Sequence, residues 1–118
     1  MKQKVHSVSY LAKAEFELKN GVYDLVALPT GAEVVKVSLE VVGNPTVGTI
    51  SVGFKDETQK NYFLTLENIT DKHATSAKDY TATSIKVVVA EVKNANGEDI
   101  KGVLRVLYFL PSVIEVEY

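Results

Sequence analysis

The feature of this sequence that most constrains its fold is the alternation of apolar and polar residues with a period of two. The most regular stretch covers residues 35–41, in which valine and leucine alternate with lysine, serine and glutamate. Shorter stretches with the same pattern cover residues 14–18, 50–54 and 85–89. Successive side chains of a β-strand point to opposite faces of a sheet, so each stretch predicts a strand with one buried face. No segment shows an amphipathic helix of three turns, which disfavours α/β architectures.

Turn-forming residues separate these strands from one another and from two less regular strands at residues 22–28 and 62–66. Glycine, asparagine and proline supply the backbone conformations that tight turns require. About seven to eight strands at this spacing predict an all-β fold, a single antiparallel β-sandwich or jelly-roll-like domain over residues 1–118. A short helical turn is expected at Asn68, in the polar stretch 67–79. The expected turns are Asn20-Gly21, Pro29-Thr30-Gly31, Gly43-Asn44-Pro45, the polar loop 56–61 and Asn96-Gly97.

The two ends of the chain differ from its middle. Residues 1–8 are basic and polar and are expected to form an N-terminal arm. Pro111 should end the strand before it, because proline donates no hydrogen bond to a sheet. Residues 111–118 are then expected to form a last short strand or an exchanged C-terminal arm. No cleavable signal and no apolar run long enough to cross a membrane is seen, so synthesis in the cytoplasm is expected.

Composition and charge exclude several classes of partner. The chain is 46% hydrophobic and 24% charged, which is typical of a globular protein that folds around a core. Its formal net charge of −2 creates no large field of either sign, so neither nucleic acid nor a membrane surface is an expected partner. The chain has no cysteine, so it can form neither a disulfide nor a thiolate metal site.

One segment near the C-terminus is apolar on both faces. Such a strand is expected in the centre of a sheet that is covered on both sides, or at an edge that a partner buries. Arg105 is its one charged residue. We therefore expect this segment to be the interface strand; the candidate residues are Val103, Leu104, Arg105, Val106, Leu107, Tyr108, Phe109 and Leu110.

The sequence carries no recognised arrangement for catalysis or cofactor binding. Its two histidines, His6 and His73, lie in no serine context typical of a nucleophilic triad. Asp71, His73 and Asp79 share one polar stretch, but their spacing matches no metal-binding loop, and a solvated loop explains them better. No glycine-rich phosphate loop is present. We therefore expect no enzyme activity, no cofactor, no metal and no small-molecule substrate.

Six tyrosines offer an alternative function. Exposed aromatic rings on one surface can stack against sugars, and Tyr62 and Tyr80 flank the polar stretch 67–79. A carbohydrate-binding or adhesin-like module would present these two side chains together. The chain has no tryptophan, which weakens this hypothesis. Tyrosines in strands more often belong to a core or an interface.

Five segments in order resemble small β-sandwich structural proteins of tailed phages and prophages. The resemblance spans about residues 22–110 and consists of a turn followed by a strand, a glycine-containing strand, and a closing strand that ends in tyrosine. It implies a component of the virion head, head–tail junction or tail, which associates with itself or docks on other particle proteins. The segments are Leu28-Pro29-Thr30-Gly31-Ala32-Glu33-Val34-Val35-Lys36-Val37, Ile50-Ser51-Val52-Gly53-Phe54, Tyr62-Phe63-Leu64, the stretch 80–89, and Gly102-Val103-Leu104-Arg105-Val106-Leu107-Tyr108.

Overall fold

A computed structural model describes residues 2–111 in full and residues 113–117 as backbone. The described part of the chain is almost entirely β-structure, and every strand pair in it is antiparallel. The all-β prediction is confirmed. In chain order, the elements are β1 (Lys2–His6), β2 (Ser9–Glu17), β3 (Gly21–Leu28), β4 (Glu33–Phe54), β5 (Leu64–Leu66), the 3-10 turn η1 (Ile69–Asp71), β6 (His73–Ser76), β7 (Tyr80–Thr81), β8 (Lys86–Phe109) and β9 (Val113–Glu117).

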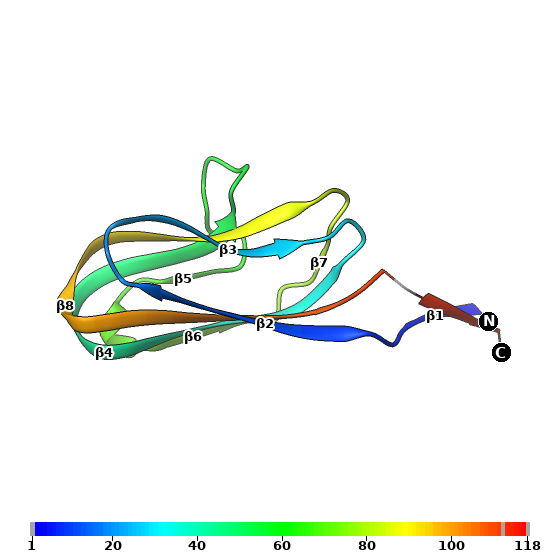
Figure 1. Ribbon diagram of the computed structural model, residues 1–118, viewed down its shortest axis with the longest axis horizontal. Helices are drawn as coiled ribbons and strands as arrows, with labels where there is room; N and C mark the ends of the chain where they lie inside the picture. The colour runs from blue at the N-terminus through cyan, green and yellow to red at the C-terminus, as the bar shows by residue number, and fades with distance from the viewer. Residues whose placement is uncertain (1, 112, 118) are drawn as a thin grey trace.

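Two long strands, β4 and β8, build both layers of the sandwich. They pair with each other along almost their whole length, and both bend in the middle (Figure 1). In one layer, the first half of β4 and the second half of β8 lie between β2 on one side and β6 and β7 on the other. In the other layer, the remaining halves lie between β3 and β5. One seven-stranded sheet therefore folds over on itself to enclose the core.

The bend lies where the sequence predicted two turns, at Gly43-Asn44-Pro45 and Asn96-Gly97. Both predictions are wrong, because Pro45 pairs with Gly97 and the two strands continue through this point. Gly43 and Gly97 have φ values of 110° and 151°, a region that favours glycine, and the register between β4 and β8 shifts at three places between Val42 and Thr49. The same residue types that make a turn here bend a paired ribbon of two strands.

The core between the layers is apolar throughout the described residues. Val34, Leu39, Ile50 and Leu104 are fully buried, and no polar or charged side chain is buried in the part of the chain that the structure describes. Val34, and not Val35, points inward, because the β4–β8 register shifts between Val34 and Lys36. The predicted alternation holds from Val37 onward.

The polar stretch 67–79 contains the expected helical turn, which is η1. The Asn68 side chain caps it by accepting a hydrogen bond of 3.1 Å from the backbone N–H of Thr70. The stretch also contains β6, which the sequence analysis did not predict. β6 is a four-residue edge strand with little apolar alternation, and its pairing with β4 defines it.

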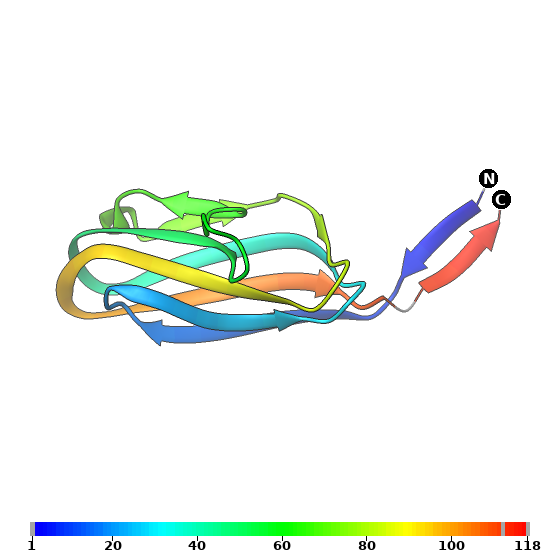
Figure 2. The same ribbon diagram turned by 90° about the horizontal axis from the view of Figure 1, so that it is seen from above.

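Strands β1 and β9 form a separate two-stranded ribbon that extends away from the sandwich (Figures 1 and 2). The molecule is therefore elongated, with extents of 54 × 24 × 18 Å. Two hydrogen bonds hold the root of the ribbon: Leu110 donates its N–H to the carbonyl of Val8 at 2.8 Å, and Nδ1 of His6 lies 2.9 Å from the carbonyl of Leu110. The terminal segments thus leave the sandwich together and at one end.

Candidate interaction surface

The proposed interface strand, residues 103–110, is the second half of β8 and continues to Leu110. β2 pairs with one of its edges and β4 with the other. The possibility that it is an edge strand buried by a partner is therefore wrong, because neither backbone edge is open. It is a central strand, and any contact with a partner must use side chains.

The side chains of this strand divide into two sets. Leu104, Val106 and Tyr108 belong to the core between the layers, and Leu104 and Val106 are fully buried. These three side chains are not available to a partner. Leu107 and Phe109 lie at the alternate positions and are half-buried. Val103, at an outward position, is buried as well.

Arg105 also occupies an outward position, and its charge is balanced on the sheet surface. Its Nη1 lies 3.0 Å from Oε1 of Glu40 on the neighbouring strand β4. This pair explains how one arginine is accommodated in an otherwise apolar strand. Because both side chains are partly exposed, the pair contributes little to stability.

Exposed apolar side chains gather around the root of the ribbon. Val5, Val8, Tyr10 and Leu11 account for four of the eight exposed large hydrophobic residues in the described chain. Tyr10 and Leu11 are 51% and 60% exposed. The half-buried side chains of Leu107, Phe109 and Leu110 adjoin them through the pairing of β2 with β8. We call this set the root patch: Val5, Val8, Tyr10, Leu11, Leu107, Phe109 and Leu110.

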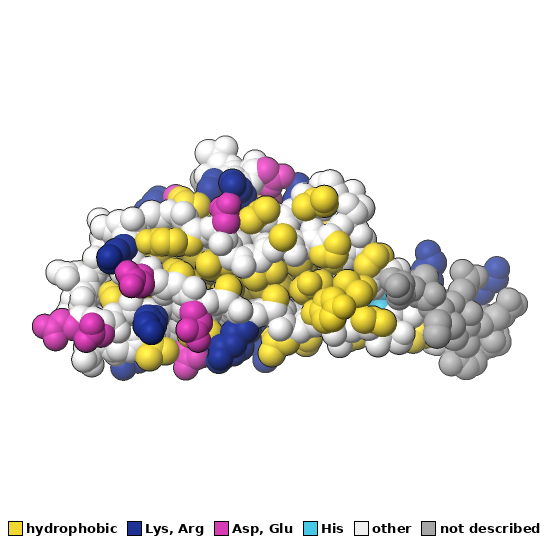
Figure 3. Space-filling model, in the orientation of Figure 1, with side chains coloured by type: hydrophobic (Ala, Val, Ile, Leu, Met, Phe, Trp, Pro, Cys, Tyr) yellow, Lys and Arg dark blue, Asp and Glu magenta, His cyan; other side chains and the backbone are white. Residues whose placement is uncertain are grey.

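The root patch covers the end of the sandwich from which the ribbon leaves. Figure 3 shows hydrophobic side chains concentrated there, along the line between the two layers. On its outer side lie two shallow hollows of about 290 and 300 Å³. The first is lined by Leu11, Leu107 and basic side chains, and the second by His6, Val35 and Phe109. Leu11, Leu107 and Phe109 lie on the outer face of the sheet and Tyr10 on the inner face beside Tyr108, so the patch wraps around the end of the sandwich. Exposed apolar surface with a polar rim is typical of protein–protein contacts.

The apolar run in the sequence predicted only the β8 part of this patch. Residues 1–8 were expected to be a basic and polar N-terminal arm, although they include Val5 and Val8. A signal was available: Tyr10 and Leu11 are consecutive, so β2 begins with one large apolar side chain on each face. A half-buried strand at the surface of a monomer would carry only one.

Tyr62 and Tyr80, the candidates for sugar stacking, do lie together, but they form no flat platform. Their rings meet edge to face, with centroids 5.4 Å apart and planes at 74°. Both rings also pack against Phe54, which is buried. The Tyr62 hydroxyl donates a hydrogen bond of 3.2 Å to the carbonyl of Asp79. The two tyrosines close one side of the core, which does not favour the carbohydrate-binding hypothesis.

Residues considered for catalysis or metal binding are dispersed. His6 lies at the ribbon root and His73 on β6. Among the described residues, no group of histidine, aspartate and glutamate side chains is arranged to hold a metal ion, and this includes Asp71, His73 and Asp79. No helix within the described ranges is long and apolar enough to cross a membrane.

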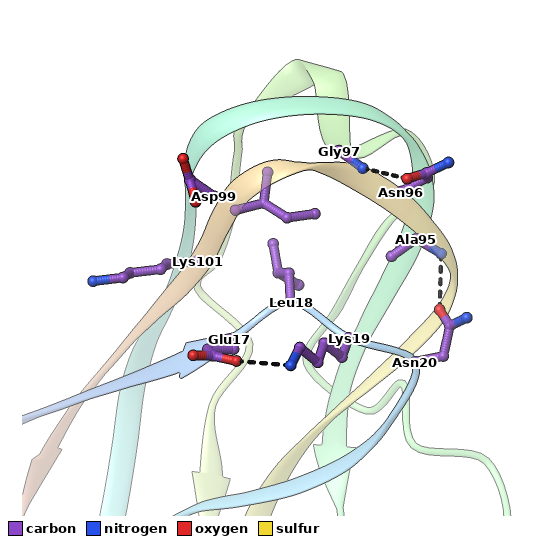
Figure 4. A pocket seen from close by; sticks show the side chains of 10 residues that line it. Glu17, Leu18, Lys19, Asn20, Ala95, Asn96, Gly97, Asp99 and Lys101 are labelled. Atoms are coloured by element: carbon purple, nitrogen blue, oxygen red, sulfur yellow. Dashed lines mark hydrogen bonds and ion pairs between the residues drawn. The ribbon is translucent and has the colours of Figure 1, made fainter.

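A cavity lies at the opposite end of the sandwich, where β8 bends. It measures about 510 Å³ and is lined by the β2–β3 hairpin and by residues 95–101 (Figure 4). Its polar side chains stabilise the bend: Oδ1 of Asn20 accepts a hydrogen bond from the N–H of Ala95 at 2.8 Å. Lys19 pairs with Glu17 at 3.2 Å. The Asn20 hydrogen bond connects the hairpin to the bend, whereas the Lys19–Glu17 pair lies within the hairpin, and neither contact assigns the cavity a chemistry.

The exposed ion pair between Lys86 and Asp56 makes a small contribution to stability that depends on pH. The hydrogen bond from Lys86 lowers the pKa of Asp56, and the same bond raises the pKa of Lys86. A depressed carboxyl pKa stabilises the folded state above the unfolded value of about 4, and this contribution is lost as the pH falls through the folded value. The raised lysine pKa stabilises the fold below about pH 10 and is lost as the pH rises through the folded value.

We expect Asp56→Asn to unfold at lower urea concentration than the native chain between about pH 4 and pH 10. The urea midpoints of the variant and the native chain should begin to approach each other below about pH 4, and they should converge as the pH falls through the lowered pKa of Asp56 and the folded carboxylate becomes protonated. Urea midpoints measured by circular dichroism at pH 7, 5, 3 and 2 check this. A difference that stays constant down to pH 2 would contradict the role of this pair.

Of the known proteins compared with this chain, only solved structures are similar to it. No protein-family model and no curated protein matches the sequence. Among solved structures, the chain is similar to one in the acidic stable capsid structure of Helicobacter pylori bacteriophage KHP30. The two share 76% identity over 100% of both chains, with a TM-score of 0.93.

Two further phage capsid structures share the fold at low identity. A chain of the cyanophage Pam1 capsid asymmetric unit is 21% identical, with a TM-score of 0.69 over 87% of this chain and 85% of that one. A chain of the Ralstonia phage GP4 capsid is 16% identical, with a TM-score of 0.61 over 92% and 87% of the two chains. The fold of this chain is thus also found in two phage capsid structures whose sequences are only 21% and 16% identical to it.

Proposed function

Because this chain belongs to the phage capsid protein family represented by the KHP30 chain and is a structural component of a phage particle, we propose that it joins the capsid of its own virion through the root patch. Its partners there are copies of itself and other capsid subunits. The role is mechanical: it requires no catalysis, substrate, cofactor, nucleic acid or membrane.

The single observation that carries this proposal is the 76% identity over the full length of a chain that forms part of a phage capsid. At that identity, the strands and their surfaces are expected to be retained as well as the fold. The resemblance noted in the sequence pointed to the same class of protein from a few strand and turn motifs. A similarity over the whole chain is a much stronger basis for the proposal.

The root patch is the surface that best suits such a role. It combines two aromatic rings, those of Tyr10 and Phe109, with several aliphatic side chains, which are common at the centre of interfaces, and it has lysine, arginine and glutamate at its rim. Leu107 and Phe109 lie on a central strand that is hydrogen-bonded on both edges, so this part of the patch is rigid. A rigid surface loses little conformational entropy on binding. Of the eight interface candidates, the proposal retains Leu107, Phe109 and Leu110.

The proposal predicts that a charge in the root patch disrupts assembly without disrupting the fold. Leu11→Asp places a carboxylate at an exposed position of β2, and we expect it to weaken association at least tenfold, since a charge there must be desolvated on docking. Light scattering at several concentrations measures self-association. Incorporation into particles made with the other capsid proteins measures docking.

The matched control is Ile85→Asp, because Ile85 is exposed by 73% and lies outside the patch. It should leave association and incorporation at native levels, and both variants should keep the native melting temperature within a few degrees. If Leu11→Asp associates and enters particles as well as the native chain does, the root patch is not the docking surface.

A further inference from the structure

The β1–β9 ribbon lacks the support that isolated strands need. It consists of five paired positions, and within the described residues no third strand pairs with it. Two-stranded ribbons are marginal in water unless another layer or strand covers them. Here no short turn joins the strands either, because the whole sandwich lies between them in the sequence.

The sandwich of the same chain offers an open edge of matching character. β2 is nine residues long and pairs with β8 on one side; within the described chain no strand pairs with its other side. Open edges present unpaired backbone groups that readily accept a further strand. β1 likewise pairs with β9 on one side only among the described residues.

The charges on the two strands are complementary. On β1, Lys2 and Lys4 are two residues apart and exposed, and on β2 the same spacing separates Glu15 and Glu17, which are also exposed. Within one chain, Lys2 and Lys4 already lie opposite Glu117 and Glu115 of β9, and Glu17 pairs with Lys19 at 3.2 Å, so a second copy would add a further neighbour to these charges. Residues two apart lie on one face of a strand. An antiparallel pairing can therefore place Lys4 opposite Glu15 and Lys2 opposite Glu17 on the same face, and opposite charges across strands are favourable.

The same register also accounts for exposed apolar side chains. Continued along the chain, it sets Val8 opposite Leu11, both of which belong to the root patch, and Val5 opposite Ala14. Val8 is 40% and Val5 39% exposed. The remaining opposed pair on the charged face, His6 and Lys13, adds no attraction. Charge and apolar contacts therefore agree on one alignment of the two strands.

We propose that β1 of one copy adds to the open edge of β2 in a second copy, with Lys4 opposite Glu15 and Lys2 opposite Glu17. This contact rests on the proposed function, which it deepens by naming the partner as a copy of the same chain and the contact as backbone pairing. Two copies can exchange ribbons reciprocally, or several can pass them around a ring, and both arrangements use the same contact. The molecular mass in solution distinguishes a reciprocal dimer from a ring of several copies.

Cross-linking tests the contact directly, because the native chain has no cysteine. A disulfide forms only when the two Cα atoms approach within about 4.4–6.8 Å. We expect a mixture of Lys4→Cys and Glu15→Cys chains to give a covalent heterodimer under mild oxidation. This heterodimer should form at least ten times faster than the heterodimer in a control mixture of Lys93→Cys with Glu15→Cys. Lys93 serves as the control because it is exposed but lies on β8 near its bend, away from β1.

A charge exchange tests the register. Lys2→Glu with Lys4→Glu in one chain should weaken association at least tenfold, and so should Glu15→Lys with Glu17→Lys. All four substitutions together should restore association to within about threefold of the native chain. Lys72→Glu with Lys93→Glu, two exposed lysines away from both strands, should have no effect.

The outcomes separate this inference from the proposed function. If the native chain associates or enters particles, but the cross-link does not exceed its control and the fourfold variant stays as weak as its parents, the ribbon contact is overturned and the capsid role stands. If the native chain neither associates nor enters particles, the proposed function fails as well.

Discussion

Phe54→Ala is expected to lower the free energy of unfolding by about 3–5 kcal/mol, which is a large part of the stability of a domain of this size. Phe54 ends β4, is 1% exposed and contacts the rings of Tyr62, Phe63 and Tyr80. Its removal leaves a cavity where four aromatic rings meet. These rings join the loop after β4 and strand β7 to the core, so the surrounding chain cannot easily close over the space.

Urea unfolding measured by circular dichroism at neutral pH tests this expectation. The matched control is Ile85→Ala, because Ile85 is a large apolar residue that is 73% exposed, and its truncation should change stability by less than about 0.5 kcal/mol. If the two variants lose similar amounts, the aromatic cluster is not a packed part of the core.

Gly43→Ala is expected to destabilise the chain by about 2–5 kcal/mol. Gly43 lies at the bend of β4 with a φ of 110°, where an L-residue is strained by about 1–2 kcal/mol. A Cβ there would also collide with the carbonyl oxygen of Asp99 on β8 and lie 3.1 Å from the Cα of Ile100. Crowding of this kind lowers the free energy of unfolding by about a further 1–3 kcal/mol.

Gly21→Ala separates the two contributions. Gly21 has a φ of 148°, but a Cβ there would meet only the Tyr23 hydroxyl, at 3.9 Å. Its cost should be close to the backbone strain alone, about 1–2 kcal/mol. Equal losses in the two variants would mean that β4 and β8 do not approach each other closely at the bend.

The sequence predicted the strands better than their connections. Alternation over residues 37–41 identified an inward face correctly, since Val37, Leu39 and Val41 are all buried. It failed at Val35, because the register shift beside this residue reverses which neighbour points inward. Such a shift depends on the partner strand, and no local pattern encodes it.

The bend was misread for a related physical reason. Glycine and asparagine allow positive φ angles whether the chain reverses or two paired strands curve together. Only the pairing of Pro45 with Gly97, residues far apart in sequence, distinguishes these cases. The sequence therefore indicated where the backbone changes direction but not that both strands continue.

The candidate interface was predicted in part. The apolar run in β8 was identified, but half of its side chains belong to the core, and the exposed half depends on β2 for its neighbours. Leu11 became part of the patch because the register sets it beside Leu107. A surface composed from two strands that lie at opposite ends of the sequence is a tertiary property.

The pairing of β1 with β9 also has a consequence for the order in which the chain folds. Lys2 pairs with Glu117, so the ribbon closes a loop that contains nearly the entire polypeptide. The pairing of β2 with β8 closes a loop of similar length, but β2 joins a sheet with a packed core, whereas the ribbon has five pairs and the side chains of β1 are mostly exposed. The ribbon should therefore form after the sandwich, when the root hydrogen bonds of His6 and Leu110 bring the ends together. Newly synthesised subunits would then pass through a state with a finished sandwich and open ends.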